Sequence, residues 1–196
     1  MTLQHIQEFF EAAGDVTTSI DCDAIKGLVN ELASVRSRQG RIFVLGVGGS
    51  AATASHAVND LRKLCGIEAY APTDNASEVT ARTNDEGWDS VFVPYLDTSH
   101  LGNYDAVFIL SVGGGDLDRN ISANLVKAVD FAIKRGARVL GIVGRKDGYA
   151  SRYGHAVVNI PMVKGEWLTP LAESFAMVVL HCLVSHPQLQ RQPTKW

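Results

Sequence analysis

The stretch Arg41-Ile-Phe-Val-Leu-Gly-Val-Gly-Gly-Ser50 decides the fold of this chain. Its apolar residues predict a buried strand over 41–45, and the glycines that follow predict a tight turn into a helix that begins at Ser50. Glycine has no Cβ, so the turn can approach a ligand closely, and the first N–H groups of a helix have no partner within it. This combination favours a small anion such as phosphate. We therefore expect Gly48, Gly49 and Ser50 to bind substrate.

Two narrower motifs can be compared with this stretch. A P-loop is excluded because no Lys follows Gly-Gly-Ser. The dinucleotide fingerprint fits only loosely, as Gly46-x-Gly48-x-x-Ala51, and Glu68 stands at the start of the second strand, whereas the ribose-binding acid closes it. We expect no nucleotide cofactor, and a nucleotide-dependent oxidoreductase is kept as a third hypothesis.

Composition limits the class of protein. The 196 residues are 46% hydrophobic and 20% charged, which predicts one globular domain. We divide it into a helical pair at 1–38, an α/β core at 39–186 and a loose tail at 187–196. The net charge is −3 and no basic cluster follows a helix face, so nucleic acid is not expected as a ligand.

Location and redox state are also predicted from composition. The N-terminus has no basic start or apolar signal core, and no apolar run is expected to approach the ~20 residues that span a bilayer. We predict a cytoplasmic protein without a membrane partner. Cys22, Cys65 and Cys182 are odd in number and widely spaced, which argues against a disulfide framework, and all three are interpreted as packing residues.

Hydrophobic periodicity predicts the order of elements. Apolar residues at three-to-four spacing predict two amphipathic helices before the first strand. Downstream, strands are predicted at 41–45, 67–71, 105–111, 137–143 and 156–160, alternating with helices near 50–65, 75–82, 120–135 and 168–186. This alternation predicts an α/β fold with a parallel five-stranded sheet sandwiched by helices. Ligands of such sheets bind beyond the carboxyl ends of the strands, where Gly46–Ser50, Ser111–Asp116 and Gly144–Gly148 fall.

The loop Ser111-Val-Gly-Gly-Gly-Asp-Leu-Asp-Arg-Asn-Ile-Ser122 is the second candidate anion site. Successive glycine N–H groups can form an anion nest, so Gly113, Gly114 and Gly115 are predicted to bind phosphate. Arg119 adds a cation, Ser122 opens the next helix, and Ser111 closes the strand.

Four side chains on two helices are the candidates for chemistry. His56 and Asp60 are four residues apart, so both lie on one helix face and could share a metal or a substrate. Glu173 and His181 are eight apart, about 12 Å along a regular helix, which is too far for adjacent ligands of one ion. Either that helix is irregular or two subunits contribute.

These residues together resemble a known family. The pattern comprises Gly-x-Gly-Gly-Ser at 46–50, His56 one turn before an acid, Asn84-Asp85-x-Gly87, Ser122–Ala128, and a last helix with Glu173 and His181. It covers most of the chain and resembles the SIS-domain sugar isomerases, and within them the phosphoheptose (sedoheptulose 7-phosphate) isomerases. The resemblance implies a flavodoxin-like strand order and a homotetramer with active sites between subunits.

The resemblance also implies a reaction. It is the interconversion of sedoheptulose 7-phosphate and a heptose 7-phosphate through an enediol, by an intramolecular oxidoreductase. Asp60 and His181 would exchange protons with the substrate. The family positions that bind zinc in some members match His56, Asp60, Glu173 and His181. Substrate contacts would come from Ser50, Asp85, Ser111, Ser122 and Glu173.

The loop 111–122 departs from the family pattern, which typically reads Ser-Thr-Ser-Gly-Asn-Ser. Here two hydroxyls are replaced and about six residues are inserted, and Val47 stands where the family has Asn. The alternative function is therefore a non-catalytic SIS module that binds a sugar phosphate or another protein, as a bacterial replication-initiation factor of this fold does.

Overall fold

A five-stranded parallel sheet forms the centre of the computed structural model, which describes residues 2–194. The strand order is β2-β1-β3-β4-β5, which confirms the predicted flavodoxin-like order. The strands are β1 (Ile42–Leu45), β2 (Ala69–Tyr70), β3 (Ala106–Ser111), β4 (Arg138–Val143) and β5 (Ala156–Asn159). All five predicted strands are present, but β2 has two residues instead of five. It lies at the edge of the sheet and pairs only with β1.

The helices follow the predicted alternation. They are α1 (Thr2–Ser19), α2 (Cys22–Ser37), α3 (Gly49–Lys63), α4 (Ala76–Glu86), α5 (Val93–Thr98), α6 (Ala123–Lys134), α7 (Tyr149–Tyr153) and α8 (Leu168–Val184). Asp21 caps α2 by accepting hydrogen bonds from the N–H groups of Asp23 and Ala24. Sequence analysis did not predict α5 and α7, because segments of five or six residues are too short to show a helical period.

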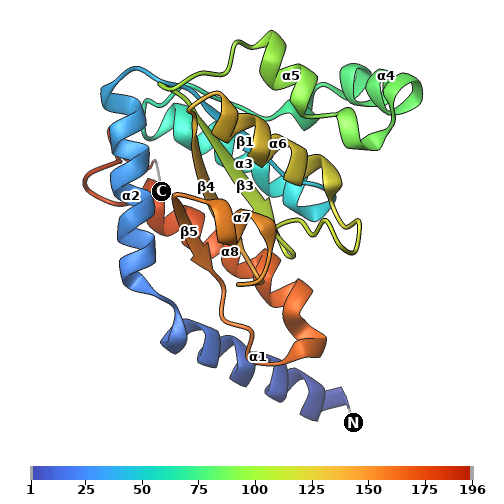
Figure 1. Cartoon of the computed structure of the whole chain (residues 1–196). Coiled ribbons are helices and arrows are strands. Elements are labelled where there is room, and N and C mark those ends of the chain that lie inside the picture. The colour runs from blue at the N-terminus through green and yellow to red at the C-terminus, as the bar shows by residue number, and fades with distance from the viewer. Residues whose placement is uncertain (1, 195–196) are drawn as a thin grey trace.

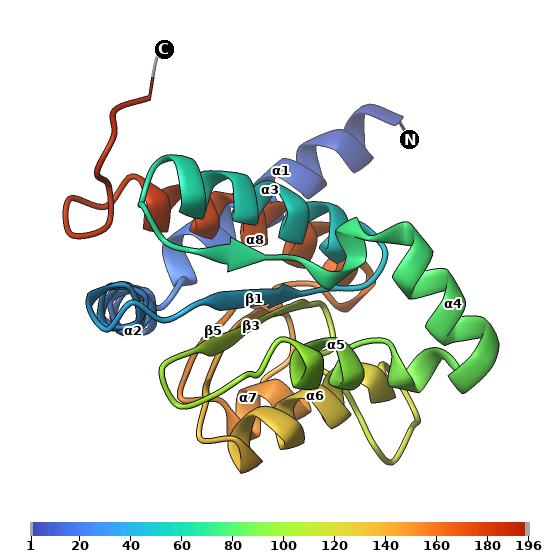
Figure 2. The ribbon, with the colours of Figure 1, turned by 90° about the horizontal axis from the view of Figure 1, so that it is seen from above.

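Two helical layers cover the two faces of the sheet. Figure 2 shows α3 and α8 on one face and α5, α6 and α7 on the other. Alternate residues of β1 serve the two layers: Ile42 and Val44 belong to the core cluster under α3 and α8, and Phe43 and Leu45 to the cluster under α5 and α6. Because both faces are covered, every residue of β1 is buried.

The N-terminal helix α1 extends away from the body of the molecule (Figure 1). Its inner face is held by Trp167, whose ring centroid lies 5.5 Å from that of Phe9, and by an ion pair of 3.2 Å between Lys164 and Glu8. Its outer face carries Leu3, Ile6 and Phe10 at i, i+3 and i+7, and these side chains are 66%, 50% and 69% exposed. An apolar stripe of this kind is typical of a surface that another chain covers.

The C-terminal tail differs from the prediction. Leu189 is fully buried, and the backbone N–H groups of Arg191 and Gln192 both donate to the carbonyl of Leu64. The guanidinium of Arg36, on α2, donates to the carbonyl of Leu189 at 2.7 Å. The expectation of a loose tail is therefore wrong as far as Gln192, because these hydrogen bonds fasten it to the domain. Residues 195 and 196 lie outside the described residues.

The cysteines are all free, as predicted, but they do not share one role. Cys65 is buried, and desolvation raises the pKa of its thiol to about 11. Cys22 and Cys182 are exposed, so their interpretation as packing residues is wrong. Both lie on helix faces turned to solvent, which the isolated sequence positions did not reveal.

One apolar segment is longer than expected. Gly165–Val184 is 20 residues long and apolar enough to match a membrane span by composition, so the prediction that no run approaches this length is wrong. In the structure most of it is α8, which packs against α3, β3 and β4. Half of its most apolar 18-residue stretch is buried inside the domain. The apolar composition of this segment is accounted for by its place in the core.

Candidate active site

Three glycine-bearing loops meet at the carboxyl edge of the sheet, as predicted. Strands β1 and β3 are neighbours, but the helices that follow them, α3 and α6, cover opposite faces, so a crevice opens between the two loops. The turn after β1 requires Gly46, because a Cβ there would lie 2.3 Å from the carbonyl oxygen of Ser50. Gly48 precedes α3 with a φ of 61°, a left-handed conformation that favours glycine.

The loop after β3 is anchored at both ends. The hydroxyl of Ser111 accepts a hydrogen bond of 3.0 Å from the N–H of Gly114. The carbonyls of Gly114 and Gly115 accept bonds of 2.9 and 2.8 Å from the first residues of α7. Gly114 and Gly115 have φ values of 72° and 87°. The inserted residues form a small hairpin closed by an antiparallel bridge between Asp116 and Ile121, which sequence analysis did not predict.

Ser122 stands at the N-cap of α6, as expected, but its φ of 51° is left-handed and its side chain makes no capping bond. The N-cap of a helix normally offers its hydroxyl to a backbone N–H. The hydroxyl of Ser122 is therefore free of that task, which leaves it available to a ligand.

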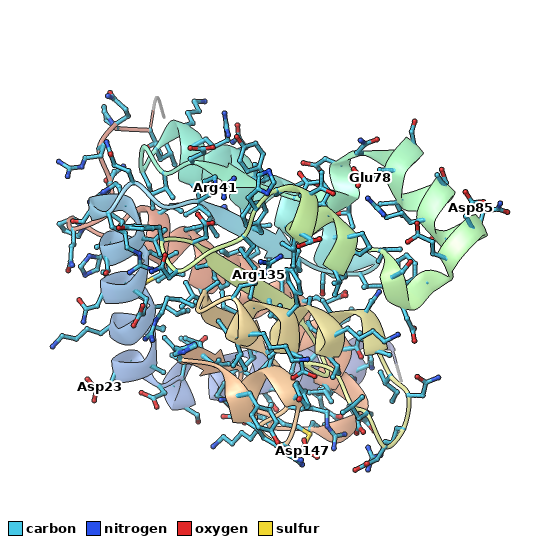
Figure 3. The ribbon with its side chains drawn as sticks, turned by 45° about the horizontal axis from the view of Figure 1, so that its top comes forward. Asp23, Arg41, Glu78, Asp85, Arg135 and Asp147 are labelled. Carbon is cyan, nitrogen blue, oxygen red and sulfur yellow. The ribbon has the colours of Figure 1, made fainter. Side chains whose placement is uncertain are left out.

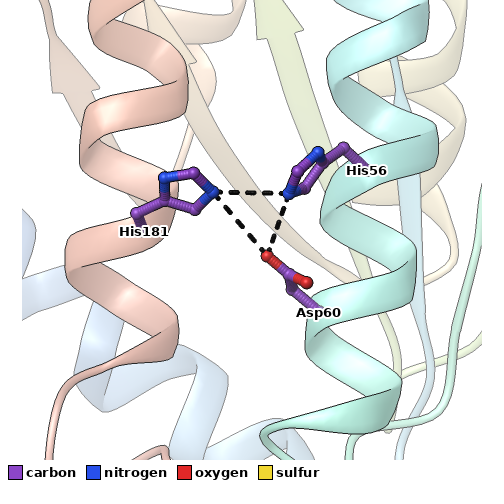
Figure 4. A group of neighbouring side chains, drawn as sticks. All are labelled: His56, Asp60 and His181. Carbon is purple, nitrogen blue, oxygen red and sulfur yellow. Dashed lines mark hydrogen bonds and ion pairs between the residues drawn. The ribbon is translucent and has the colours of Figure 1, made fainter. Parts of the chain in front are cut away.

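Three predicted chemical residues come together on the outer side of α3 and α8 (Figure 4). The Nε2 atom of His56 lies 3.2 Å from the Oδ2 atom of Asp60 and 3.3 Å from the Nε2 atom of His181. The same carboxylate oxygen of Asp60 is 3.9 Å from the Nε2 atom of His181. The Asp60 side chain is 13% exposed, and the two imidazoles are 46% and 55% exposed. We call these three residues the His-Asp-His trio.

Glu173 stands apart from the trio. Its carboxylate lies beside the first residue of α3: a Cβ on Gly49 would meet Oε1 at 2.7 Å. Helix α8 runs without interruption from Leu168 to Val184, so the eight residues between Glu173 and His181 keep them about 12 Å apart. The assignment of Glu173 as a fourth metal ligand beside the trio therefore fails within one chain. Glu173 instead lines a small cavity with Ser50, Thr53 and Ser111, where a substrate contact is expected.

Asp85 is also separated from the other candidates. It lies on α4, at the outer edge of the molecule in Figure 3. Its carboxylate accepts a hydrogen bond of 2.6 Å from the side chain of Asn84.

Sequence analysis missed one group of residues. The loop Gly144–Gly148 was placed at the rim, but its charged side chains were assigned no role. In the structure Arg145 and Asp147 line a small cavity together with Gly113, Gly115 and Arg119. The charged segment Arg145-Lys146-Asp147, which lies between two glycines at the end of a buried strand, is the signal that identifies them.

The chain is similar to several known proteins over most of its length. No family model matches the sequence. It is 31% identical over 192 residues to the lincomycin biosynthesis protein LmbN of Streptomyces lincolnensis, covering 92% of this chain and 68% of that protein. It is 30% identical over 148 residues to the phosphoheptose isomerase of Chlorobaculum tepidum, covering 72% of this chain and 68% of that protein. The solved phosphoheptose isomerase GmhA of Neisseria gonorrhoeae shares the fold, with a TM-score of 0.80 at 22% identity over 94% of this chain and 98% of that one.

The comparisons agree with three features of the structure: the strand order of the sheet, the glycine turn at residues 46–50 and the His-Asp-His trio. The chain therefore belongs to the SIS-domain phosphoheptose isomerase family.

Proposed function

We propose that this protein is an aldose–ketose isomerase that interconverts sedoheptulose 7-phosphate and a heptose 7-phosphate through an enediol. The observation that carries the proposal is the approach of His56, Asp60 and His181 from two helices whose first turns lie at the glycine rim. Relatives named as phosphoheptose isomerases support the reaction class.

The reaction needs two proton-transfer groups. A base removes a proton from the carbon beside the carbonyl, which gives an enediol, and the proton then returns to the former carbonyl carbon. Another proton moves between the two oxygens. Asp60 is the base and His181 the acid in our proposal, because the carboxylate oxygen and Nε2 lie 3.9 Å apart and so can both contact one substrate. His56 contacts both groups and fixes their positions.

As an alternative to direct proton transfer, the trio fits a zinc ion, because the Nε2 atom of His181 cannot coordinate the ion and donate a proton at the same time. Ligand atoms on one tetrahedral zinc are separated by about 3.3 Å, given Zn–N distances of ~2.0–2.1 Å. The three ligand atoms here are 3.2, 3.3 and 3.9 Å apart. His56, Asp60 and His181 would hold the ion and leave a coordination position open, as catalytic zinc sites do. When bound, zinc would polarise the carbonyl oxygen of the substrate.

The separation of Glu173 from His181 supports a long substrate. The two residues lie about 12 Å apart along α8, from the glycine rim to the trio. An extended chain of seven carbons that ends in a phosphate spans about 10 Å, with single C–C bonds of ~1.5 Å. A heptose phosphate therefore comes closer to spanning the distance from the rim to the trio than a pentose phosphate does. Glu173, at the rim end of this distance, accepts hydrogen bonds from sugar hydroxyls.

We also propose that the protein is a homotetramer with sites between subunits. The exposed apolar stripe of Leu3, Ile6 and Phe10 needs a cover, and the N-terminal helices of several copies can supply one as a bundle. Asp85, on α4, then contacts substrate held by another copy. Light scattering at micromolar concentration should report a tetramer. A stable monomer would contradict both the bundle and the shared site.

The cellular location is part of the proposal. Three free cysteines, two of them exposed, agree with a reducing compartment such as the cytoplasm.

A turnover assay across C5 to C7 sugar phosphates, with and without added zinc, tests the proposed function. We expect isomerisation of sedoheptulose 7-phosphate and little turnover of pentose phosphates. The second candidate is a non-catalytic binding module, which the inserted hairpin at Asp116–Ile121 favours because it changes the loop next to the expected phosphate site. Binding of a sugar phosphate, shown by a rise in melting temperature, without turnover of any of them would favour that module over the isomerase.

A further inference from the structure

Two rim loops enclose a polar pocket, and sequence analysis assigned a role to only one of them, the glycine loop after β3. The glycine loop after β3 and the loop after β4 are joined by the hydrogen bonds from the start of α7 to the carbonyls of Gly114 and Gly115. The contact is close, since a Cβ on Gly148 would lie 2.1 Å from the carbonyl oxygen of Gly113. The small cavity between the loops is lined by the backbone of these glycines and by the side chains of Arg119 and Arg145.

Backbone donors in this cavity are free. Within the described residues, the N–H groups of Gly113 and Gly115 make no hydrogen bond to any backbone or side-chain acceptor. Backbone N–H groups seldom lack a partner, and free N–H groups in one glycine turn can point at a single anion. Such a nest binds an oxyanion.

The other candidate anion site, the glycine turn at the start of α3, is less suited to phosphate. The carboxylate of Glu173 already lies next to Gly49, and a phosphate placed there would meet a like charge. The cavity at Gly113 and Gly115 is lined by two aspartates, but each of them is paired with an arginine, whose guanidinium group has several donors for phosphate oxygens.

Each arginine has a carboxylate from its own loop. Arg145 donates to Asp147 through Nε at 2.9 Å and through a terminal nitrogen at 2.5 Å. Arg119 faces Asp116, with Nε 3.7 Å from Oδ2. The pKa of Asp147 is lowered to about 2, chiefly by its hydrogen bonds from Arg145, so this carboxylate is ionised at neutral pH. A phosphate that enters the cavity must therefore compete with Asp147 for Arg145.

We propose that Arg145 binds the phosphate group of the ligand, together with Arg119 and the N–H groups of Gly113 and Gly115, and that Asp147 is the internal counter-ion with which the phosphate competes. The inference rests on the proposed function only in taking the ligand to be a phosphosugar. It adds Arg145 and Asp147 to the site as residues that set the strength of phosphate binding.

The test measures binding of inorganic phosphate by calorimetry to the full-length protein, so it does not depend on turnover. Arg145→Ala should weaken phosphate binding by about 10- to 100-fold, as expected for lost hydrogen bonds between charged groups. Asp147→Asn should strengthen it by several-fold, because the competing charge is removed. Arg135→Ala is the matched control: Arg135 is also an exposed arginine paired with an aspartate, Asp97, and it lies outside this cavity. Its affinity for phosphate should equal that of the wild type.

Two results would overturn the proposal. Phosphate binding that is equal in Arg145→Ala and the wild type would remove Arg145 from the site. Weaker binding in Asp147→Asn would show that Asp147 positions Arg145 and does not compete with the ligand. The same variants separate this inference from the proposed function. If the protein is an isomerase but its phosphate affinity does not depend on Arg145, only the inference is refuted. If phosphate binding depends on Arg145 but the protein has no turnover, only the isomerase function is refuted.

Discussion

Replacing His181 with Asn should lower the turnover of sedoheptulose 7-phosphate by about 100- to 10,000-fold while substrate binding persists. Asparagine keeps a polar end of similar size but cannot exchange a proton near neutral pH. The side chain of His181 is 55% exposed, so its replacement should change the melting temperature little. The measurement is kcat and KM of the purified variant, with its melting temperature.

The matched control is His186→Asn, because His186 follows the same helix, lies outside the trio and has a ring that accepts a hydrogen bond from the backbone N–H of Gln188. This variant should retain wild-type turnover. A His181 variant with a lower melting temperature and unchanged turnover per folded molecule would assign the residue to packing. Zinc content then separates the chemical roles: zinc lost together with activity in both His56→Ala and His181→Asn means ligation, and a wild type free of zinc leaves proton transfer.

Replacing Gly114 with Val should abolish phosphate binding and leave the domain folded. Gly114 has a φ of 72°, which a β-branched residue adopts only at a cost of ~1–2 kcal/mol. The loop is expected to relax to a negative φ, which turns its N–H groups away from the anion and breaks the nest. A Cβ at this position has no contact closer than 3.5 Å, so the strain concerns the backbone and not the core. Calorimetry with inorganic phosphate and a melting curve measure the two effects.

Gly136→Val provides the control for backbone strain. Gly136 has a φ of 71°, and its nearest contact for a Cβ is also 3.5 Å, but it lies in the turn between α6 and β4, at the opposite ends of the strands from the glycine loops. This variant should lose a similar amount of stability and bind phosphate normally. Wild-type phosphate affinity in Gly114→Val would mean that residues 113–115 are only a turn.

Local patterns in the sequence were sufficient for the sheet and for two of the three residues of the trio. Buried parallel strands are short apolar runs, so β1, β3, β4 and β5 could be placed within about a residue. The length of the edge strand β2 was overestimated, because it pairs with β1 through only two of its residues. The pair His56 and Asp60 followed from helical spacing alone, since residues four apart share a face.

The rest of the site depends on how distant elements pack. Sequence spacing placed Glu173 and His181 on one helix but could not say which of them meets α3 at Asp60, because that depends on how far α8 is shifted along α3. It also could not bring Arg145 next to the glycine loop, since that contact is made by two loops about 30 residues apart in the chain.

The sequence by itself determined the α/β class, the strand order implied by the family resemblance, the glycine turn and the His56–Asp60 pair, because each rests on local backbone preferences or a single helical repeat. Only the tertiary structure decided that His181 joins this pair, that Glu173 remains at the start of α3, and that Arg119 and Arg145 face one cavity. These outcomes are set by the packing of α8 on α3 and of the β3–α6 loop on the β4–α7 loop. Side-chain packing of this kind is a relation between segments distant in sequence, and no local pattern encodes it.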